Sequence, residues 1–233
     1  MRRRYGRSAT IRKWLRRLAI ALLVLVAISW VLVLPLRWVN PPTSAFMLAD
    51  KSGLDPVLFE WAAWADIGVS PSLAVVAAED QKFSQHFGFD VQSIESAIGD
   101  FENGLSLRGA STITQQVAKN LFLWSGRSFV RKGIEAWFTV LIELSLPKQR
   151  ILEIYLNVAQ FGPGIYGVPA ASRYYFNKDP YRVTDNQAAL LAAVLPNPNR
   201  LQVDRPSRYV RQRQRWIYRQ MQRLRREHWL TTL

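Results

Sequence analysis

The sequence predicts a mainly α protein in which one membrane-spanning helix precedes a helical domain. The first observation is an uncharged apolar run of 19 residues, Leu18–Leu36. The second is that helix-start signals, namely serine or threonine caps and prolines in the first turn, recur at short intervals from Ser70 onward. The third is that no stretch shows the sustained period-two alternation of a half-buried strand. A chain of 233 residues is long enough for one large domain with a sizeable core.

The apolar run has the length of a single membrane-spanning helix, which needs about 20 residues. The 17 residues before it carry eight cations and no acid, whereas only Arg37 lies close behind it. The positive-inside rule then places the N-terminus in the cytoplasm and the rest of the chain across the membrane. A cleaved signal peptide is the alternative, but Pro35, Arg37 and Trp38 stand where a small-x-small cleavage site is needed. We therefore expect an uncleaved anchor.

The chain divides into four parts. Residues 1–17 are a cytoplasmic basic tail, 18–37 the transmembrane helix, 38–70 a membrane-proximal segment and 71–233 the main domain, which ends in a basic amphipathic helix. The membrane-proximal segment is rich in aromatic residues that suit the domain core and the membrane interface equally well. These aromatic residues are Trp38, Phe46, Phe59, Trp61 and Trp64.

The helices of the main domain follow from their start signals. A serine, threonine or proline precedes most of them, and a glycine-rich turn at residues 161–167 precedes one. The expected helices are Ser70–Glu79, residues 91–101, a helix capped by Ser111 that ends near Phe122, one capped by Ser128 that ends near Leu144, one opened by Ser145-Leu146-Pro147 that ends at Val158, Ala170–Phe176, Asn186–Leu195 after Thr184-Asp185, and a long last helix after Pro206.

The composition excludes several kinds of chemistry. The chain has no cysteine, so disulfides, thiolate catalysis and cysteine metal sites are excluded. It has only two histidines, His86 and His228, so a zinc site is not expected. The formal net charge of +14 comes from the ends of the chain, because residues 200–226 alone carry ten arginines and one acid.

The last helix is basic and amphipathic, since apolar residues recur among its arginines at steps of three, four or seven. It could pack on the domain and turn its arginines to water, or lie on anionic lipid headgroups, and we expect packing together with membrane-surface contact. Nucleic-acid binding is a third alternative, which a domain outside the cytoplasm disfavours. The apolar positions are Val210, Ile217, Met221, Leu224 and His228.

Glu79 is the first candidate catalytic residue. It ends an otherwise apolar run that begins at Leu73. A carboxylate on an apolar helix face loses solvation, so its pKa should rise toward the range that is useful for proton transfer. The alternative is that Glu79 and Asp80 are simply the first exposed acids at a helix end.

A cluster of polar and basic residues forms the second candidate feature. On a helix that begins near Ser111, residues four apart share a face, which places Ser111, Gln115 and Lys119 in one row with Gln116 and Asn120 beside it. In the next helix, Arg131 and Lys132 precede Glu135 by four and three residues. These could be only surface ion pairs, worth about 0.3–0.5 kcal/mol each. Together with Lys119 and Arg127, however, they would make a cradle for a diphosphate.

Five segments, in this order, resemble the peptidoglycan glycosyltransferases, the polymerase domains of penicillin-binding proteins and their monofunctional relatives, the biosynthetic transglycosylases. The resemblance covers about residues 75–210 and implies a lysozyme-like, bilobal helical domain with a large lobe and a smaller membrane-proximal jaw lobe. The segments are EDQKFSQHFGFD (79–90), RGASTITQQVAKN (108–120), RKGIE (131–135), KQRILEIYLNVAQFGPGIYGVPAASRYYF (148–176) and AALLAAVLPNP (188–198).

The resemblance implies the reaction and a role for each matching residue. Lipid II would be polymerised into β-1,4-linked glycan strands, with inversion and release of undecaprenyl diphosphate. Glu79 would be the general base, and Glu135 would lie near the leaving diphosphate and orient its cations or a divalent ion. The residues implied to bind substrate are Ser111, Gln115, Gln116, Lys119, Asn120, Arg127, Arg131 and Lys132, and those implied to support the motif around Glu79 are Asp80, Phe83 and His86.

The charge pattern independently favours transfer over hydrolysis. A diphosphate leaving group needs cations, whereas a glycosidase needs a carboxylic acid to protonate an alkoxide. Glu135, surrounded by cations, should stay ionised and would be a poor acid. A glycan-cleaving enzyme and a non-catalytic scaffold of cell-wall synthesis remain the rival functions.

The expected cofactors, partners and location follow from the same resemblance. No cofactor is required by the sequence, although magnesium or manganese could bridge a glutamate and the diphosphate. The expected partners are lipid II, the growing lipid-linked glycan, the membrane, and other proteins of cell-wall synthesis and division, but not nucleic acid. The layout suits a single-pass protein of the cell inner membrane with a periplasmic catalytic domain.

Overall fold

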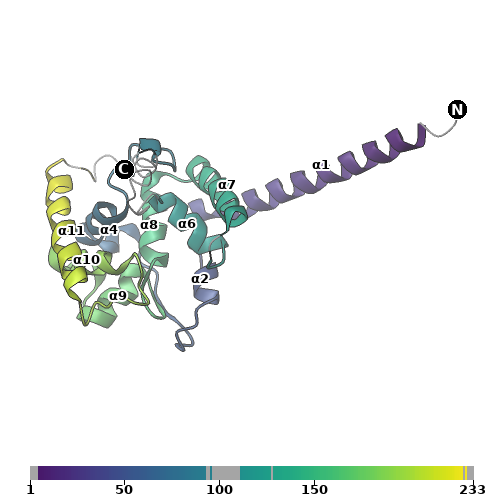
Figure 1. Cartoon of the computed structure of the whole chain (residues 1–233). Helices are drawn as coiled ribbons and strands as arrows, with labels where there is room; N and C mark the ends of the chain where they lie inside the picture. The colour runs from purple at the N-terminus through teal and green to yellow at the C-terminus, as the bar shows by residue number, and fades with distance from the viewer. Residues whose placement is uncertain (1–4, 93–94, 96–110, 127, 228, 230–233) are drawn as a thin grey trace.

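The structure, a computed structural model, describes residues 5–92, 95, 111–126, 128–227 and 229. Helix α1 (Tyr5–Val33) projects from one side of a body built mainly of helices (Figure 1). The mainly α prediction is therefore confirmed, and the arrangement is consistent with a lysozyme-like fold. The predicted helix over residues 91–101 lies largely outside the described residues.

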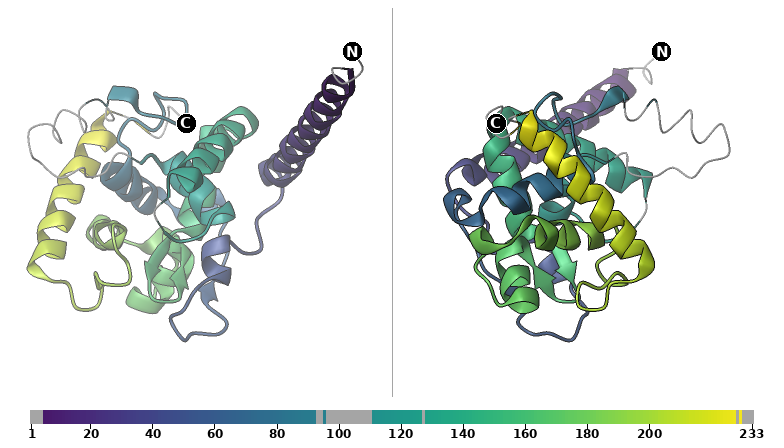
Figure 2. Two further views of the ribbon diagram at one scale, coloured as in Figure 1. Left: turned by 45° about the vertical axis from the view of Figure 1, so that its right-hand side comes forward. Right: turned by 90° about the vertical axis from the view of Figure 1, so that its left-hand side faces the viewer.

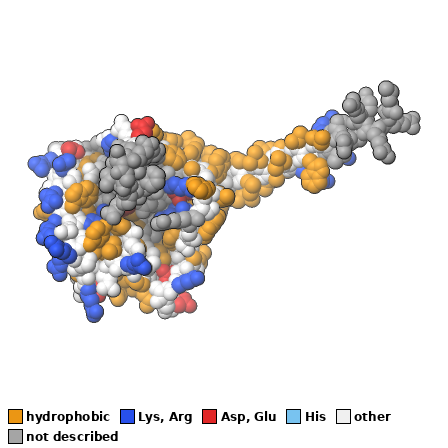
Figure 3. Space-filling view, viewed as in Figure 1, with side chains coloured by type: hydrophobic (Ala, Val, Ile, Leu, Met, Phe, Trp, Pro, Cys, Tyr) orange, Lys and Arg blue, Asp and Glu red, His pale blue; other side chains and the backbone are white. Residues whose placement is uncertain are grey.

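Helix α1 begins well before the apolar run predicted to span the membrane. It continues through the basic residues on the N-terminal side, because arginine, lysine and leucine are all good helix formers. The part from Ile11 onward, with the short 3₁₀ turn η1 (Leu34–Arg37), is long and apolar enough to cross a membrane. Its side chains are largely uncovered by protein, with Leu22 62% and Leu23 68% exposed. Figure 3 shows hydrophobic side chains along this helix. The helix thus fits a single-pass membrane anchor.

The end of α1 is attached to the body. Val33 and Leu36 are buried, and α1 packs against α7 (Phe129–Ser145). The Arg37 guanidinium donates to the carbonyl of Ser145 at 3.0 Å, and Arg150 donates to the carbonyl of Leu36 at 2.9 Å. These contacts join the anchor to the domain at a defined point.

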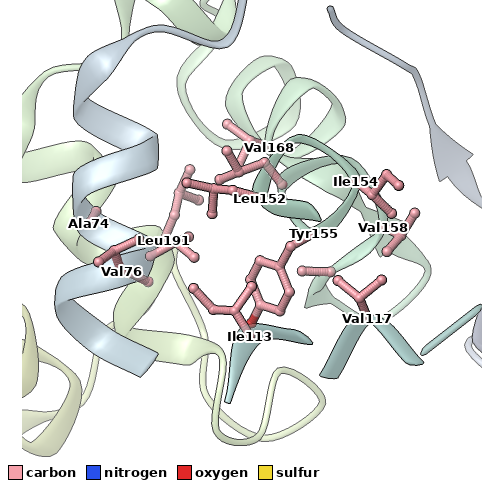
Figure 4. Close-up of a cluster of buried hydrophobic side chains, with 14 of the residues drawn as sticks. Ala74, Val76, Ile113, Val117, Leu152, Ile154, Tyr155, Val158, Val168 and Leu191 are labelled. Carbon is pink, nitrogen blue, oxygen red and sulfur yellow. The ribbon is translucent and has the colours of Figure 1, made fainter. Parts of the chain in front are cut away.

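The core is formed by side chains from several helices. Figure 4 shows side chains of α4 (Val69–Glu79), α6 (Ile113–Phe122), α8 (Lys148–Val158), α9 (Gly167–Phe176) and α10 (Asp185–Val194) converging in one apolar cluster. Tyr155 of α8 lies within this cluster and is 1% exposed. Helix α7 and the end of α1 form a smaller unit that joins the larger one through α6. Because α6 contacts both units, side chains along it can reach a site between them.

Three short strands form a sheet that the sequence did not reveal. They are β1 (Leu58–Phe59), β2 (Gln160–Gly162) and β3 (Ile165–Tyr166), in the order β1-β3-β2. β1 pairs with β3 in parallel, with Leu58 opposite Ile165, and β2 pairs with β3 antiparallel. Strands of two or three residues are too short to show period-two alternation. The remaining short elements are α2 (Ala45–Leu48), α3 (Trp64–Ile67) and η2 (Pro180–Arg182).

Several predicted helix starts are confirmed, and others shift by one to three residues. Ser128 and Thr184 cap α7 and α10 as expected. Thr112, not Ser111, caps α6, because its hydroxyl accepts from the backbone N–H of Gln115. Helix α9 begins at Gly167 and not at Ala170, since the chain passes from β3 into the helix without an intervening loop.

Helix α4 begins at Val69, before the predicted start at Ser70. Gly68, with a φ of +84°, provides the turn that precedes the helix. The Ser70 hydroxyl does not cap the helix and instead donates to Asp185 at 2.6 Å. The same carboxylate accepts from Gln222 at 3.0 Å and from Arg225 at 2.7 Å, and so ties α4, α10 and the last helix together.

The last helix, α11 (Arg208–Arg226), packs on the body as one of the predicted alternatives requires. Val210, Ile217, Met221 and Leu224 are buried against α4 and α10; His228 lies outside the described residues. Figures 1 and 2 show α11 on the side of the body away from α1. Lysine and arginine side chains gather at this edge of the molecule in Figure 3.

The aromatic residues before α4 differ in how far they are buried. Most of them are partly buried against the core, whereas Trp38, next to the anchor, is 71% exposed. The partly buried ones are Phe46, Phe59, Trp61 and Trp64.

Gly167 combines a positive φ with the shortest distance from a would-be Cβ to a backbone atom among the described glycines. Its φ is +81°, and a Cβ there would lie 2.4 Å from the carbonyl oxygen of Asn157 in α8. Gly53 has a similar φ of +86° but no atom within 4 Å of its would-be Cβ. We expect Gly53→Ala to lower the free energy of unfolding by about 1–2 kcal/mol through backbone strain alone.

Gly167→Ala should lower it by about 1–3 kcal/mol more, because the new methyl group collides with α8. Chemical denaturation of the detergent-solubilised protein measures both values. Equal losses in the two variants would contradict the collision.

Candidate active site

Glu79 is the last residue of α4 and the centre of the site. Its side chain is only 14% exposed, because the rest of α4 is packed in the core. The carboxylate accepts two hydrogen bonds from elements far away in the sequence. The Gln116 amide of α6 donates to Oε2 at 2.9 Å, and the Arg213 guanidinium of α11 donates to Oε1 at 3.1 Å. Three helices therefore meet at this one side chain.

Burial raises the pKa of Glu79 above its ordinary value, as expected from the apolar run. The hydrogen bond from Gln116 and the positive charges of Arg213 and Lys119 act in the opposite direction. The carboxylate thus combines a raised affinity for a proton with partners that still accommodate its charge. This combination is the one a general base requires.

Tyr155 fixes the orientation of the Gln116 amide. The tyrosine hydroxyl donates to Gln116 Oε1 at 3.0 Å, so the amide nitrogen must face Glu79. Burial, and then the nearby negative charge of Glu79, raise the pKa of Tyr155, so it remains a hydroxyl donor. The resulting chain of donors runs from the core of α8 through α6 to the carboxylate.

Asp80 and its neighbours support the position of Glu79. One carboxylate oxygen of Asp80 lies 2.9 Å from His86 Nε2, and the other accepts from the backbone N–H of Ile113 at 3.0 Å. Phe83 is fully buried, and its ring meets the His86 ring edge-on at 6.4 Å. These contacts join the end of α4 to the start of α6, and the supporting role of the three residues stays a prediction.

Glu135 lies across the cleft and is held by two cations of its own helix. It is 3% exposed, and its oxygens accept from Arg131 at 2.7 Å and from Lys132 at 2.5 Å. Lys132 also lies 3.4 Å from the Ser111 hydroxyl. The i,i+3 and i,i+4 spacing read from the sequence therefore does place both cations on this carboxylate.

Lys119 lies between the two glutamates. Burial lowers its pKa, the charge of Glu135 opposes this, and the charge of Arg131 reinforces it. Its ammonium also lies 5.4 Å from the centre of the Phe46 ring. A poorly hydrated cation in this position is well suited to attract an anionic group of a ligand.

A cleft of about 740 Å³ brings most of the predicted residues together. It has the volume that small-molecule sites commonly have, although its walls are unusually polar. Glu79 and Glu135 both line it, together with cationic side chains. Its lining includes Ser111, Gln115, Gln116, Lys119, Arg131, Lys132, Leu195, Pro196, Tyr209 and Arg213.

Gln115 has a second role besides lining the cleft, and two other predicted substrate-binding residues are not part of that lining. The Gln115 side chain accepts from the Thr112 backbone N–H at 3.0 Å in a capping box, so it also stabilises the start of α6. Asn120 lines an adjoining cavity of about 130 Å³ beside Tyr155. Arg127 lies outside the described residues.

Arg213 and Tyr155 are site residues that sequence reasoning missed. Arg213 is one of ten arginines in its region, and only its place in a gap of the apolar stripe, between Val210 and Ile217, distinguishes it. Tyr155 lies in a helix of mostly buried residues and carries no signal that separates it from an ordinary core tyrosine.

The described residues do not fit a dedicated metal centre. Among them, no group of three or more histidine, aspartate or glutamate side chains could hold an ion. A divalent cation at Glu135 would have to displace Arg131 or Lys132 from a carboxylate oxygen.

Comparison with known proteins agrees with the geometry. Residues 53–222 match the family model described as Transglycosylase. A biosynthetic peptidoglycan transglycosylase of Stutzerimonas stutzeri is 52% identical over 227 residues, covering 94% of this chain and 93% of that protein. Proteins of the same description are 54% identical over 217 residues in Pseudomonas putida (90% and 92% covered) and 49% identical over 229 residues in Pseudomonas aeruginosa (96% and 99% covered).

The match to the family model spans α4 through most of α11 and so includes both glutamates and the cations between them. The relatives are about 50% identical to this chain over nearly its whole length. The similarity therefore extends well beyond the residues of the site. This chain belongs to the transglycosylase family and is a peptidoglycan glycosyltransferase.

Proposed function

We propose that the cleft joins lipid II to a growing lipid-linked glycan, with Glu79 as the general base. The observation that carries the proposal is a buried carboxylate in the same cleft as Lys119, Arg131 and Lys132. A base and a set of cations in one cleft suit two substrates, one that loses a proton and one that loses a diphosphate.

The chemical step follows from these positions. Glu79 takes the proton of the acceptor 4-hydroxyl on N-acetylglucosamine, and the oxygen attacks C1 of the donor N-acetylmuramic acid. The bond from C1 to the diphosphate oxygen breaks, and its electron pair leaves with undecaprenyl diphosphate. The α-linked donor thus becomes a β-1,4 linkage, with inversion at C1.

The cations stabilise the leaving diphosphate. Lys119 is poorly solvated, so its charge acts through a medium that screens it weakly. Arg131 and Lys132 are held in place by Glu135, which gives this glutamate a positioning role at the diphosphate end of the cleft. Arg127 remains a predicted member of this group. A divalent ion that bridges Glu135 and the diphosphate also remains only a prediction.

The same geometry disfavours the rival functions. A hydrolase needs a second carboxylic acid that can give a proton to the leaving oxygen. The only candidate among the residues that line the main cleft, Glu135, has both oxygens engaged with cations. A non-catalytic scaffold would have no use for a buried carboxylate held by Gln116 and Arg213, since such burial costs stability.

We also propose that α1 anchors the enzyme in the cell inner membrane with the N-terminus in the cytoplasm and the catalytic domain in the periplasm. The basic residues before the apolar run support this orientation. Helix α7, which packs beside α1, exposes Phe129 (98%), Val130 (70%) and Leu144 (59%). These side chains suit contact with the membrane that holds the lipid substrate.

Replacing Glu79 tests the base directly. We expect Glu79→Gln to lower the rate of lipid II polymerisation at least about a hundredfold, because the amide cannot accept the proton. The measurement is the initial rate with labelled lipid II and detergent-solubilised protein.

Glu60→Gln is the matched control, because Glu60 is an exposed acid paired with Arg173 away from the cleft. It should polymerise at the wild-type rate. A Glu79→Gln enzyme that keeps more than about a tenth of the activity would refute Glu79 as the base. Shortening of preformed glycan by the wild type, with lipid II left untouched, would favour hydrolysis.

Replacing Arg213 tests how the charge of Glu79 is maintained. Arg213 favours the ionised carboxylate, so Arg213→Gln should raise the pKa of Glu79 further. A base is lost as pH falls through its pKa, so the acidic limb of the pH profile of kcat/KM should move to higher pH. Activity should recover toward wild type as pH rises. Arg219→Gln, an exposed arginine of the same helix, should leave the profile unchanged. A loss of equal size at every pH would mean that Arg213 acts on substrate and not on Glu79.

The absence of cysteine makes the orientation directly testable. A cysteine introduced at Arg205, whose side chain is 85% exposed, should react with a membrane-impermeant maleimide in cells with a permeabilised outer membrane. A cysteine at Ser8 should react only after lysis, and the wild type provides the unlabelled background. The reverse pattern would overturn the proposed orientation.

A further inference from the structure

Two exposed aromatic side chains lie on the side of α11 that borders the site. Tyr209 and Trp216 are seven residues apart, close to two helical turns, and so share a face with Arg213 between them. Tyr209 is 48% exposed and Trp216 is 39% exposed, although the opposite side of the helix is buried. Solvent-exposed aromatic rings beside an active site can mark a surface that binds a ligand.

The hollows around Glu79 connect these rings with the reaction centre. Tyr209 lines the main cleft together with Arg213. Trp216 lines a second cavity of about 280 Å³, which shares Glu79 and Ser111 with the main cleft. A shallow depression bounded by Tyr209, Gln212, Arg213 and Trp216 joins the two along the surface of α11. The aromatic face therefore continues from the main cleft into the second cavity beside Glu79.

The lining of the second cavity has the character of a sugar site. A pyranose ring has apolar C–H faces and a rim of hydroxyl groups. The negative π-face of an indole attracts such C–H groups, and polar side chains can pair with the rim. Besides Trp216, the cavity is lined by Gln81, Lys82, Asp90 and Ser111. Its volume is near the lower end of the range for small-molecule sites and is sufficient for one ring.

We propose that Trp216 and Tyr209 form an aromatic platform that binds a pyranose ring of the glycan next to the reaction centre. The inference rests on the proposed function, because it takes the occupant from the reaction at Glu79. Trp216 stacks on the ring in the second cavity, and Tyr209 lines the path along α11. The ring belongs either to the acceptor lipid II or to the growing strand, and both present the same N-acetylated pyranose.

Binding in the absence of turnover tests the platform independently of catalysis. In the full-length Glu79→Gln protein, calorimetry with purified, uncross-linked peptidoglycan oligosaccharide should give a Kd at least about fivefold weaker when Trp216→Ala is added, with Trp216→Phe retaining most of the affinity. Arg215→Ala, an exposed neighbour on α11, is the matched control and should bind as well as the parent.

Kinetics in the otherwise wild-type enzyme identify which substrate carries the ring. A higher KM for lipid II in Trp216→Ala, with strand length unchanged, assigns the platform to the acceptor. Shorter strands with an unchanged KM assign it to the growing glycan. Thermal unfolding of each variant separates these effects from misfolding, and Tyr209→Ala provides a second test on a more exposed side chain.

Oligosaccharide affinity, KM and strand length that are all unchanged in Trp216→Ala and Tyr209→Ala would overturn the platform, while the polymerase function would stand. Trp216→Phe that is as impaired as Trp216→Ala would also overturn it, because stacking needs only an aromatic face. A wild-type enzyme that fails to polymerise lipid II would instead refute the proposed function.

Discussion

The position of one buried carboxylate constrains much of this structure. Glu79 lies at the end of an apolar helix, where its charge is poorly solvated, so the fold must provide partners for both oxygens. Those partners come from α6 and from α11, and each is itself held in place: Gln116 by Tyr155 of the core, and α11 by its apolar stripe and the Asp185 network. The packing of at least four helices therefore converges on the chemistry of a single proton acceptor.

The charges of Glu79 and Glu135 are stabilised in different ways. At Glu79, burial raises the pKa of the carboxylate, while the donors Gln116 and Arg213 still accommodate its charge. At Glu135, the carboxylate holds Arg131 and Lys132 in place, and burial keeps the nearby Lys119 poorly hydrated. Fixed charges of this kind need little rearrangement when a diphosphate develops negative charge. In the proposed reaction, the group that accepts the proton is separate from the cations that stabilise the diphosphate, whereas a glycosidase relies on a pair of carboxyl groups.

Local sequence rules predicted most helices because their signals act within a single turn. Ser128 and Thr184 cap the helices that they were expected to cap, and the i,i+4 spacing of Arg131 and Glu135 is realised as an ion pair. The failures have both local and long-range causes. Ser111 and Thr112 compete for one cap, and only the backbone geometry selects Thr112. Ser70 has an alternative acceptor in Asp185, 115 residues away, which no local rule could reveal. The strands of the small sheet are held by partners distant in the chain and carry no periodicity of their own.

The sequence by itself determined the helical class, the anchor-like apolar helix, the family resemblance, and both glutamates with the cations beside Glu135. These properties depend on composition, on motifs, and on residues within one or two helical turns of each other. Only the tertiary structure decided that Arg213 faces Glu79 across 134 residues, that Tyr155 orients Gln116, and that Trp216 borders the reaction centre. Ten arginines in one basic segment look alike until the packing of α11 turns a single one toward the carboxylate. Long-range contacts of this kind depend on how whole helices pack, so they cannot be predicted from local patterns in one sequence.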